Sequence, residues 1–285
     1  MGLNVIRVSF LREVTHFEMR TYWKVALLGW QDSLVYRFNA LVWVLYAVIP
    51  SLTLMLVWLA AYEGNPESRI GGLDLSGMMT YYLFVTALSV IITPHPEWDI
   101  AQAIRDGKIT PFLLRPVGYF GYRFAWETSY QIVKTLMMLP AFGLLWWFFR
   151  SYIHLPPFDA VRLGWFVLAS VGAFVLLMQL KFLLGITAFW LLEPGGLMEI
   201  WNVLNGLFAG RLLPLQLLPS WAQLIGNVLP FSILYAFPMD ILLNMATPEQ
   251  IFWGFARQLG WLAVLSLCVR FVWRRGLLAY AAVGT

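Results

Sequence analysis

Long apolar runs alternate with short polar segments along this chain. The runs are roughly 20 residues or more in length, the length needed to cross a bilayer as a helix. They lack the alternation of apolar and polar residues that the strands of a membrane barrel require. The pattern therefore predicts an all-α integral membrane protein that forms one domain, residues 1–285. Six spans are predicted, at residues 36–62, 76–94, 128–149, 161–192, 196–214 and 250–272.

Two further segments have a different pattern. Residues 9–33 carry apolar side chains on one helix face and several basic side chains opposite, which predicts an amphipathic helix at the cytoplasmic interface. The alternative is that they are the entry to the first span. Residues 217–243 are apolar but interrupted, which favours two short re-entrant half-helices on the outer side over one continuous span. The interrupting residues are Pro219, Gly226, Pro230 and Pro238.

Composition agrees with a membrane protein. Hydrophobic residues make up 60% of the chain and charged residues 12%, about half the usual share of a soluble domain. The formal net charge is +4, but the basic residues lie in separated loops without a stripe, so nucleic acid is not an expected partner. The single cysteine, Cys268, excludes a disulfide within the chain.

The basic residues also predict an orientation. With the N-terminus inside, twelve Lys and Arg residues lie in cytoplasmic segments and three, Arg69, Arg150 and Arg162, lie outside. This excess follows the positive-inside rule and places both termini and residues 95–127 in the cytoplasm.

Residues 95–127 form a polar island between two apolar runs, with four basic and four acidic residues. Pro96 suits the first position of a helix and Gly107 the position just after its end, so about three helical turns are predicted between them. The predicted apolar side contains Ile100, Ala103 and Ile104, and the polar side contains Asp99, Gln102 and Asp106. Such a helix can dock on a partner or on its own membrane domain, or it can be a solvated loop helix.

Motifs for catalysis are missing. Gly107-Lys108 is followed by Ile109 and lacks the upstream glycine of an ATP-binding phosphate loop. Neither a zinc-protease H-E-x-x-H motif nor a G-x-S-x-G nucleophile elbow occurs. The sequence therefore predicts a protein that is not an enzyme and that holds no metal or cofactor of its own.

Two motifs resemble a known family. Residues 98–109 (WDIAQAIRDGKI) and 112–116 (FLLRP) resemble the E-x-D-I-A-x-x-I-R-x-G-x-[IL] and L-L-R-P pattern of bacterial permeases of second-type ATP-binding-cassette (ABC) exporters. In particular, they resemble the uncharacterised branch found beside an ATPase and a second permease. Residues 218–221 (LPSW), 229–231 (LPF) and 235–238 (YAFP) are similar to the family's segment before the last span.

The resemblance implies an ABC exporter subunit in the bacterial inner membrane, among membrane lipids, with a second permease that is either a related chain or a second copy. ATP and Mg²⁺ would bind to a separate cytoplasmic ATPase subunit. The island would supply the coupling helix that rests on this subunit, and residues 217–243 would cap the translocation path. The implied coupling residues are Glu97, Trp98, Asp99, Ile100, Gln102, Ala103, Ile104, Arg105 and Asp106.

Charged residues within the spans are candidates for the translocation path, because such groups are costly in a bilayer unless they face a cavity or a partner. The candidates are Lys181, Glu199 and Arg211. A Lys181–Glu199 pair, or a Lys181 side chain that reaches the interface, is an alternative, and Arg211 could pair with Asp240 as structural bracing. Lys134 and Arg257 lie near enough to predicted span ends to reach the membrane surface.

Few buried polar groups are expected, so an amphipathic or lipid-like cargo is favoured over a sugar or an ion. Two other functions remain open. A membrane enzyme acting on lipid headgroups would need polar residues that converge at one interface. A non-transporting scaffold or sensor permease would bind the ATPase but move no cargo.

Overall fold

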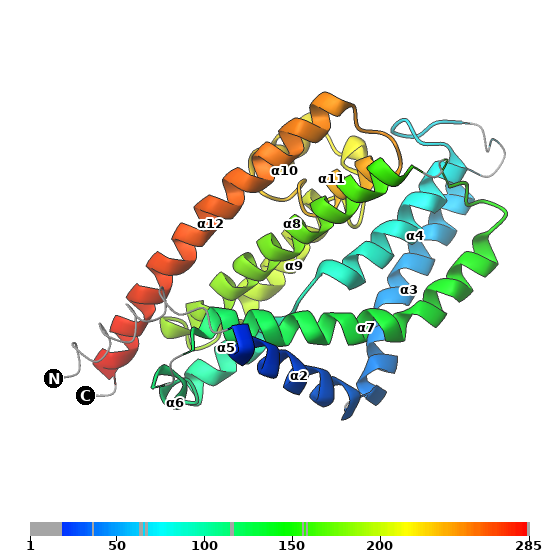
Figure 1. Ribbon diagram of the computed structural model, residues 1–285. Coiled ribbons are helices and arrows are strands. Elements are labelled where there is room, and N and C mark those ends of the chain that lie inside the picture. The colour runs from blue at the N-terminus through cyan, green and yellow to red at the C-terminus, as the bar shows by residue number, and fades with distance from the viewer. Residues whose placement is uncertain are drawn as a thin grey trace.

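The computed structural model describes residues 19–35, 37–62, 65, 68–114, 117–155, 157 and 159–283, and their regular elements are helical (Figure 1). Residues 9–18 of the predicted interfacial helix, and Arg115 and Pro116 of the island, lie outside this description. The helices are α2 (Met19–Val35), α3 (Arg37–Ala61), α4 (Leu75–Ile92), α5 (Pro96–Arg105), α6 (Thr110–Leu113), α7 (Tyr119–Phe149), α8 (Ala160–Ile186), η1 (Thr187–Phe189), α9 (Gly195–Phe208), η2 (Leu215–Leu217), α10 (Ser220–Val228), α11 (Ala236–Leu242) and α12 (Pro248–Val283).

Four helical stretches among the described residues are long and apolar enough to cross a membrane. They are Leu75–Arg105, Tyr119–Phe149, Ala160–Phe189 and Pro248–Tyr280. The spans predicted at 36–62 and 196–214 fall on α3, whose apolar part is Leu45–Ala61, and on α9. The 14 residues of α9 end at Phe208. This helix is therefore about 21 Å long at a rise of about 1.5 Å per residue, shorter than predicted.

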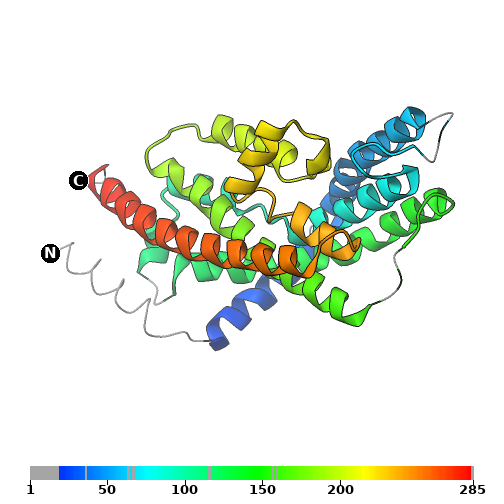
Figure 2. The same cartoon turned by 90° about the horizontal axis from the view of Figure 1, so that it is seen from above.

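Helix α8 is the centre of the bundle. It contacts α4, α5, α11 and α12, and Leu176, Leu177 and Met178 in its middle are fully buried. Figure 2 shows α12 along one side of the molecule, and α3, α4 and the C-terminal part of α7 grouped together at one end of it. A change in the position of α8 must therefore be felt by several membrane helices at once.

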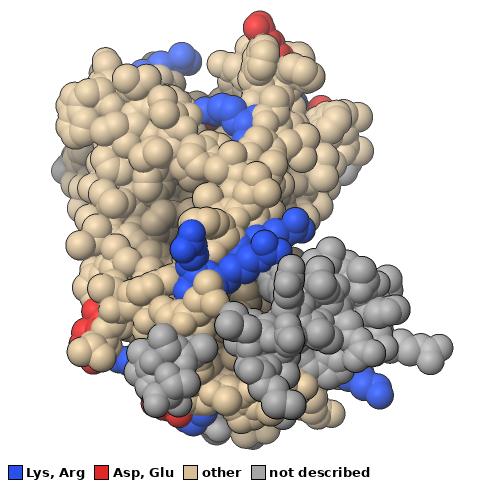
Figure 3. Space-filling model, turned by 90° about the vertical axis from the view of Figure 1, so that its left-hand side faces the viewer, with Lys and Arg blue, Asp and Glu red and all other residues tan. Residues whose placement is uncertain are grey.

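The polar island and the C-terminal part of α12 share one end of the bundle, whereas α10 and α11 lie at the opposite end (Figure 1). The Thr110 and Tyr280 hydroxyls lie 2.8 Å apart, and the Tyr119 and Trp273 rings stack with their centroids 5.4 Å apart. Figure 3 shows basic side chains gathered mainly in the lower half of an otherwise largely uncharged face. Helix α12 carries Arg270 and Arg275, both exposed. The shared end is the one that the basic residues assign to the cytoplasm.

Candidate functional site: helix α5, a buried ion network and a basic cavity

Helix α5 has the local structure that its sequence predicts. Pro96 occupies the first turn and Asp106 is the C-cap. Gly107 follows with φ of +72°, in the left-handed region that glycine adopts without strain. Lys108 Nζ donates a hydrogen bond of 2.8 Å to the exposed Asp106 carboxylate and lowers its pKa. The helix is therefore fixed at both ends by its own sequence.

The two sides of α5 face different surroundings. Ile100 and Ile104 are buried in a cluster with Phe182 and Ile186 of α8 and with Trp273 of α12. Ala103 is half-buried. The apolar side therefore docks on the membrane domain of this chain. The exposed side consists of Trp98, Asp99, Gln102, Arg105 and Asp106, which we call the outer face of α5.

The outer face continues onto the link between α8 and α9. Arg105 Nη1 lies 3.2 Å from Glu193 Oε1, and both side chains are exposed. The Trp98 ring lies 3.7 Å from where a Cβ on Gly195 would be. The surface offered at this end therefore combines two charged groups and an indole ring from two segments.

Beneath α5 lies a buried ion pair. Lys181 Nζ of α8 donates a hydrogen bond to Glu97 Oε1 at 2.5 Å, and both side chains are almost completely buried. Lys181 Nζ also lies 3.2 Å from Nδ1 of His95. The proposed alternative of a Lys181–Glu199 pair is therefore wrong, since Glu199 is exposed elsewhere on α9. Two of the predicted residues, Lys181 and Glu97, come together across 84 positions of sequence.

Helix α7 adds a buried polar stripe with members at positions i, i+4, i+8 and i+11 of one helix face. Arg123 Nη2 contacts Asp99 at 2.7 Å and Glu127 at 3.2 Å. Gln131 and Lys134 both donate hydrogen bonds to the backbone oxygen of Thr93, at 2.8 and 3.2 Å. The stripe thus joins α7 to both α5 and the end of α4. In the sequence, polar residues at this spacing within an apolar helix indicate a polar face, and this pattern could have identified the stripe.

Next to this stripe is a cavity of about 250 Å³ between α3, α4, α7 and residues 211–212. Its basic residues are His95, Lys134 and Arg211, and no Asp or Glu lines it. Lys134 is buried, so it does not reach the membrane surface as its place in the sequence suggested.

The chain between α9 and η2 places Arg211 at this cavity. Gly210 has φ of +86°, and a Cβ there would lie 2.9 Å from the Tyr81 hydroxyl. Tyr81 and Tyr82 of α4 donate hydrogen bonds of 2.5 and 2.7 Å to the backbone oxygens of Gly210 and Leu212. Arg211 forms no ion pair with Asp240, so the predicted bracing pair is not present among the described residues.

A family model supplies the identification. The model described as ABC-2 family transporter protein matches residues 48–284. The chain belongs to the ABC-2 transporter family. It is therefore a multi-pass membrane protein and a transport component of an ABC transporter. No curated protein and no solved structure matches it.

Family membership confirms the resemblance drawn from residues 98–116 and 218–238. An ABC-2 membrane component implies an ATPase partner, and members of the family are in general non-catalytic. Among the described residues there is no group of three or more His, Cys, Asp and Glu side chains suited to a metal ion.

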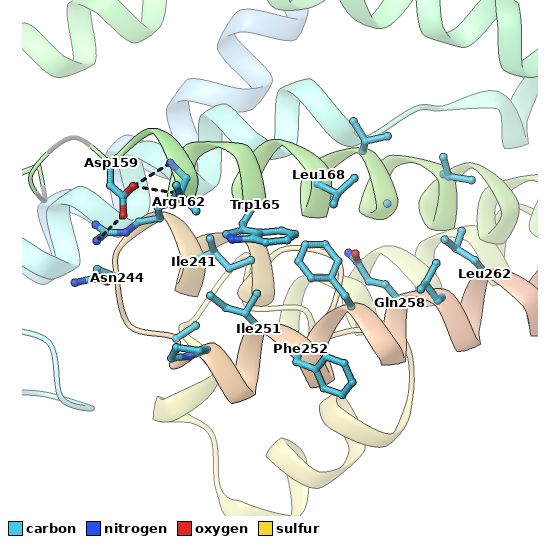
Figure 4. A pocket seen from close by; sticks show the side chains of 18 residues that line it. Asp159, Arg162, Trp165, Leu168, Ile241, Asn244, Ile251, Phe252, Gln258 and Leu262 are labelled. Atoms are coloured by element: carbon cyan, nitrogen blue, oxygen red, sulfur yellow. Dashed lines mark hydrogen bonds and ion pairs between the residues drawn. The ribbon is translucent and has the colours of Figure 1, made fainter.

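This ABC-2 protein has a second hollow, a groove of about 880 Å³ between α8 and α12 (Figure 4). Its walls are mainly apolar, with Trp165, Leu168 and Phe252 among the lining side chains. Gln258 is polar, but its amide donates to the backbone oxygens of Ala169 and Ile233 at 3.0 Å each. The groove therefore presents hydrocarbon surface, unlike the basic cavity.

Proposed function

We propose that this chain is the permease subunit of an ATP-driven exporter, and that the outer face of α5 receives the movement of a separate ATPase subunit. The observation that carries this proposal is the division of α5 into two faces. Its apolar side is docked on α8, and its outer face is left exposed at the end of the bundle assigned to the cytoplasm.

The contacts of α5 explain how movement would spread. Glu97 ties α5 to Lys181 of α8, and Asp99 ties it to Arg123 of α7. Glu97 and Asp99 are two positions apart in the first turn of α5. Packed and hydrogen-bonded elements move as units rather than deforming continuously. A displacement of α5 would therefore move α7 and α8 together.

The remaining parts of the proposal follow the resemblance. ATP and Mg²⁺ bind to the ATPase subunit, and a second permease, a related chain or another copy, completes the membrane part. Residues 217–243, which contain α10 and α11 at the opposite end, cap the translocation path on the outside. The cargo is an amphipathic or lipid-like molecule.

The test is co-expression with a cassette ATPase subunit of the kind that the family implies as a partner. We expect Trp98→Ala with Arg105→Ala to weaken ATPase association by roughly tenfold or more, because exposed Trp and Arg residues dominate many interfaces at about 2 kcal/mol or more each. Co-purification and ATP hydrolysis by the assembled complex are the measurements.

Arg150→Ala is the matched control, since Arg150 is an exposed arginine at the end of α7 remote from α5. It should leave assembly and hydrolysis unchanged. Full assembly and hydrolysis by the Trp98/Arg105 variant would contradict the coupling role. ATPase binding without cargo movement in vesicles would instead favour the scaffold, and lipid turnover by the purified chain alone would favour the enzyme.

A further inference from the structure

Lys134 and Arg211 of the basic cavity have no ion-pair partner among the described residues. Lys134 Nζ donates one described hydrogen bond, to the Thr93 backbone oxygen at 3.2 Å, and no carboxylate of the described residues lies within 4.0 Å of it. Glu97 and Glu127 lie nearby but are engaged by Lys181 and Arg123. Lys134 is therefore a buried amine with donor capacity to spare.

Arg211 adds a second cation to the same cavity. Its side chain is half-buried, and it makes no hydrogen bond or ion pair with the other described residues. Tyr81 and Tyr82 hold the backbone on either side of it against α4. The backbone on both sides of Arg211 is fixed, and its guanidinium donors are unused. Such a group is suited to bind a carboxylate or a phosphate.

The other polar groups of the cavity do not compete as donors. The Thr86 hydroxyl donates to the Tyr82 backbone oxygen at 2.6 Å, and the Ser89 hydroxyl donates to the Thr86 backbone oxygen at 2.8 Å. The Ser51 hydroxyl lies 2.5 Å from that of Thr86. Lys134 and Arg211 thus supply donors to the cavity that these three hydroxyl groups do not.

The cavity also has an apolar opening. Tyr46 and Leu212 line it and are exposed, and Ala47, Pro50 and Leu54 of α3 line it as well. These α3 residues belong to the apolar part of that helix, Leu45–Ala61. A molecule that enters here meets hydrocarbon surface first and then cations, which matches an amphiphile rather than a free ion.

We propose that this cavity binds the anionic headgroup of the transported amphiphile, a phosphate or carboxylate group held by Lys134 and Arg211. The proposal rests on the permease function and names its class of cargo. An anion supplies what the cavity lacks, because it gives a direct partner to the buried Lys134 and the half-buried Arg211.

The experiment measures lipid retention by the purified full-length chain in a neutral detergent. Native mass spectrometry compares phosphatidylglycerol, an anionic lipid, with phosphatidylcholine, a zwitterionic lipid, at matched concentrations. We expect the unchanged chain to prefer phosphatidylglycerol by roughly tenfold, the effect of one charge-assisted contact. Lys134→Gln with Arg211→Gln should reduce this preference to about equal retention.

Two controls separate the cavity from surface charge and from misfolding. Arg270→Gln with Arg275→Gln removes two exposed cations of α12 and should keep the preference. Lys134→Arg with Arg211→Lys keeps the charges and should also keep it. Equal retention of both lipids by the unchanged chain, or a preserved preference in the Lys134/Arg211 glutamine variant, would overturn the proposal.

Competition identifies the source of the anion. Inorganic phosphate at millimolar concentration should not displace bound phosphatidylglycerol, and displacement would overturn the assignment to an amphiphile. No ATPase subunit is present in this experiment. Loss of lipid preference would therefore leave the α5 coupling test unaffected, and failure of the coupling test would leave the lipid result standing.

Discussion

Glu97→Ala is expected to destabilise the folded chain by about 3–5 kcal/mol, the usual cost of leaving one partner of a buried ion pair without the other. Lys181 would remain almost fully buried with no carboxylate beside it. The free energy of unfolding in mixed detergent micelles, followed by tryptophan fluorescence, measures the loss. If α5 couples to the ATPase as proposed, the same change should also lower the ATP hydrolysis of the assembled complex, because α5 would lose its ion pair with α8.

Asp106→Ala is the matched control for this prediction. Its partner Lys108 lies at 2.8 Å, but both groups are exposed, so removal of the pair should not change stability measurably. Glu97→Leu combined with Lys181→Met replaces the buried pair with apolar groups and should restore much of the lost stability. A Glu97→Ala chain as stable as the Asp106→Ala chain would contradict the structural role of the pair.

The sequence was sufficient to predict features set by neighbouring residues. Pro96 and Gly107 delimit α5, and the spacing of Ile100 and Ile104 indicated which side is apolar. These features depend on local backbone preferences and on the period of one helix. The sequence also indicates that Lys181 is a functional candidate, because a charged residue is rare within an apolar run.

The partners of these residues depend on tertiary packing and could not be predicted in the same way. Glu97 and Lys181 are 84 positions apart, and Glu199 was as good a partner by sequence. Whether α5 docks on its own chain or on another was also open. The apolar side of α5 packs against α8, with Glu97 buried and Trp98 exposed on the outer face.

The ends of the helices also differ from the ends of the predicted spans. The third span was predicted to begin at residue 128, but α7 begins at Tyr119, so Lys134 lies well inside the helix and not near its end. The fifth span was predicted to reach residue 214, but α9 ends at Phe208 and the chain turns at Gly210. Lys134 and Arg211 both line one cavity, which the predicted span ends did not indicate.

The proposed coupling needs a tight contact between α5 and α8, and Gly185 of α8 packs closely against α5. A Cβ on Gly185 would lie 2.8 Å from the Ile100 Cβ and 3.0 Å from the Glu97 backbone oxygen. Backbone atoms cannot move aside as a flexible side chain can. The absence of a side chain at this position therefore lets α5 lie against α8 with the Lys181–Glu97 pair closed.

Gly185→Ala is accordingly expected to destabilise the chain by about 1–3 kcal/mol, the usual cost of an overpacked contact. Gly164→Ala in the same helix is the matched control, since nothing lies within 4 Å of its Cβ position. Alanine favours a helix interior over glycine by about 0.5–1 kcal/mol, so this control should stabilise the chain slightly. Micelle unfolding curves of the two variants should shift in opposite directions. Equal shifts of the two unfolding curves would show that α5 and α8 are not closely packed at Gly185.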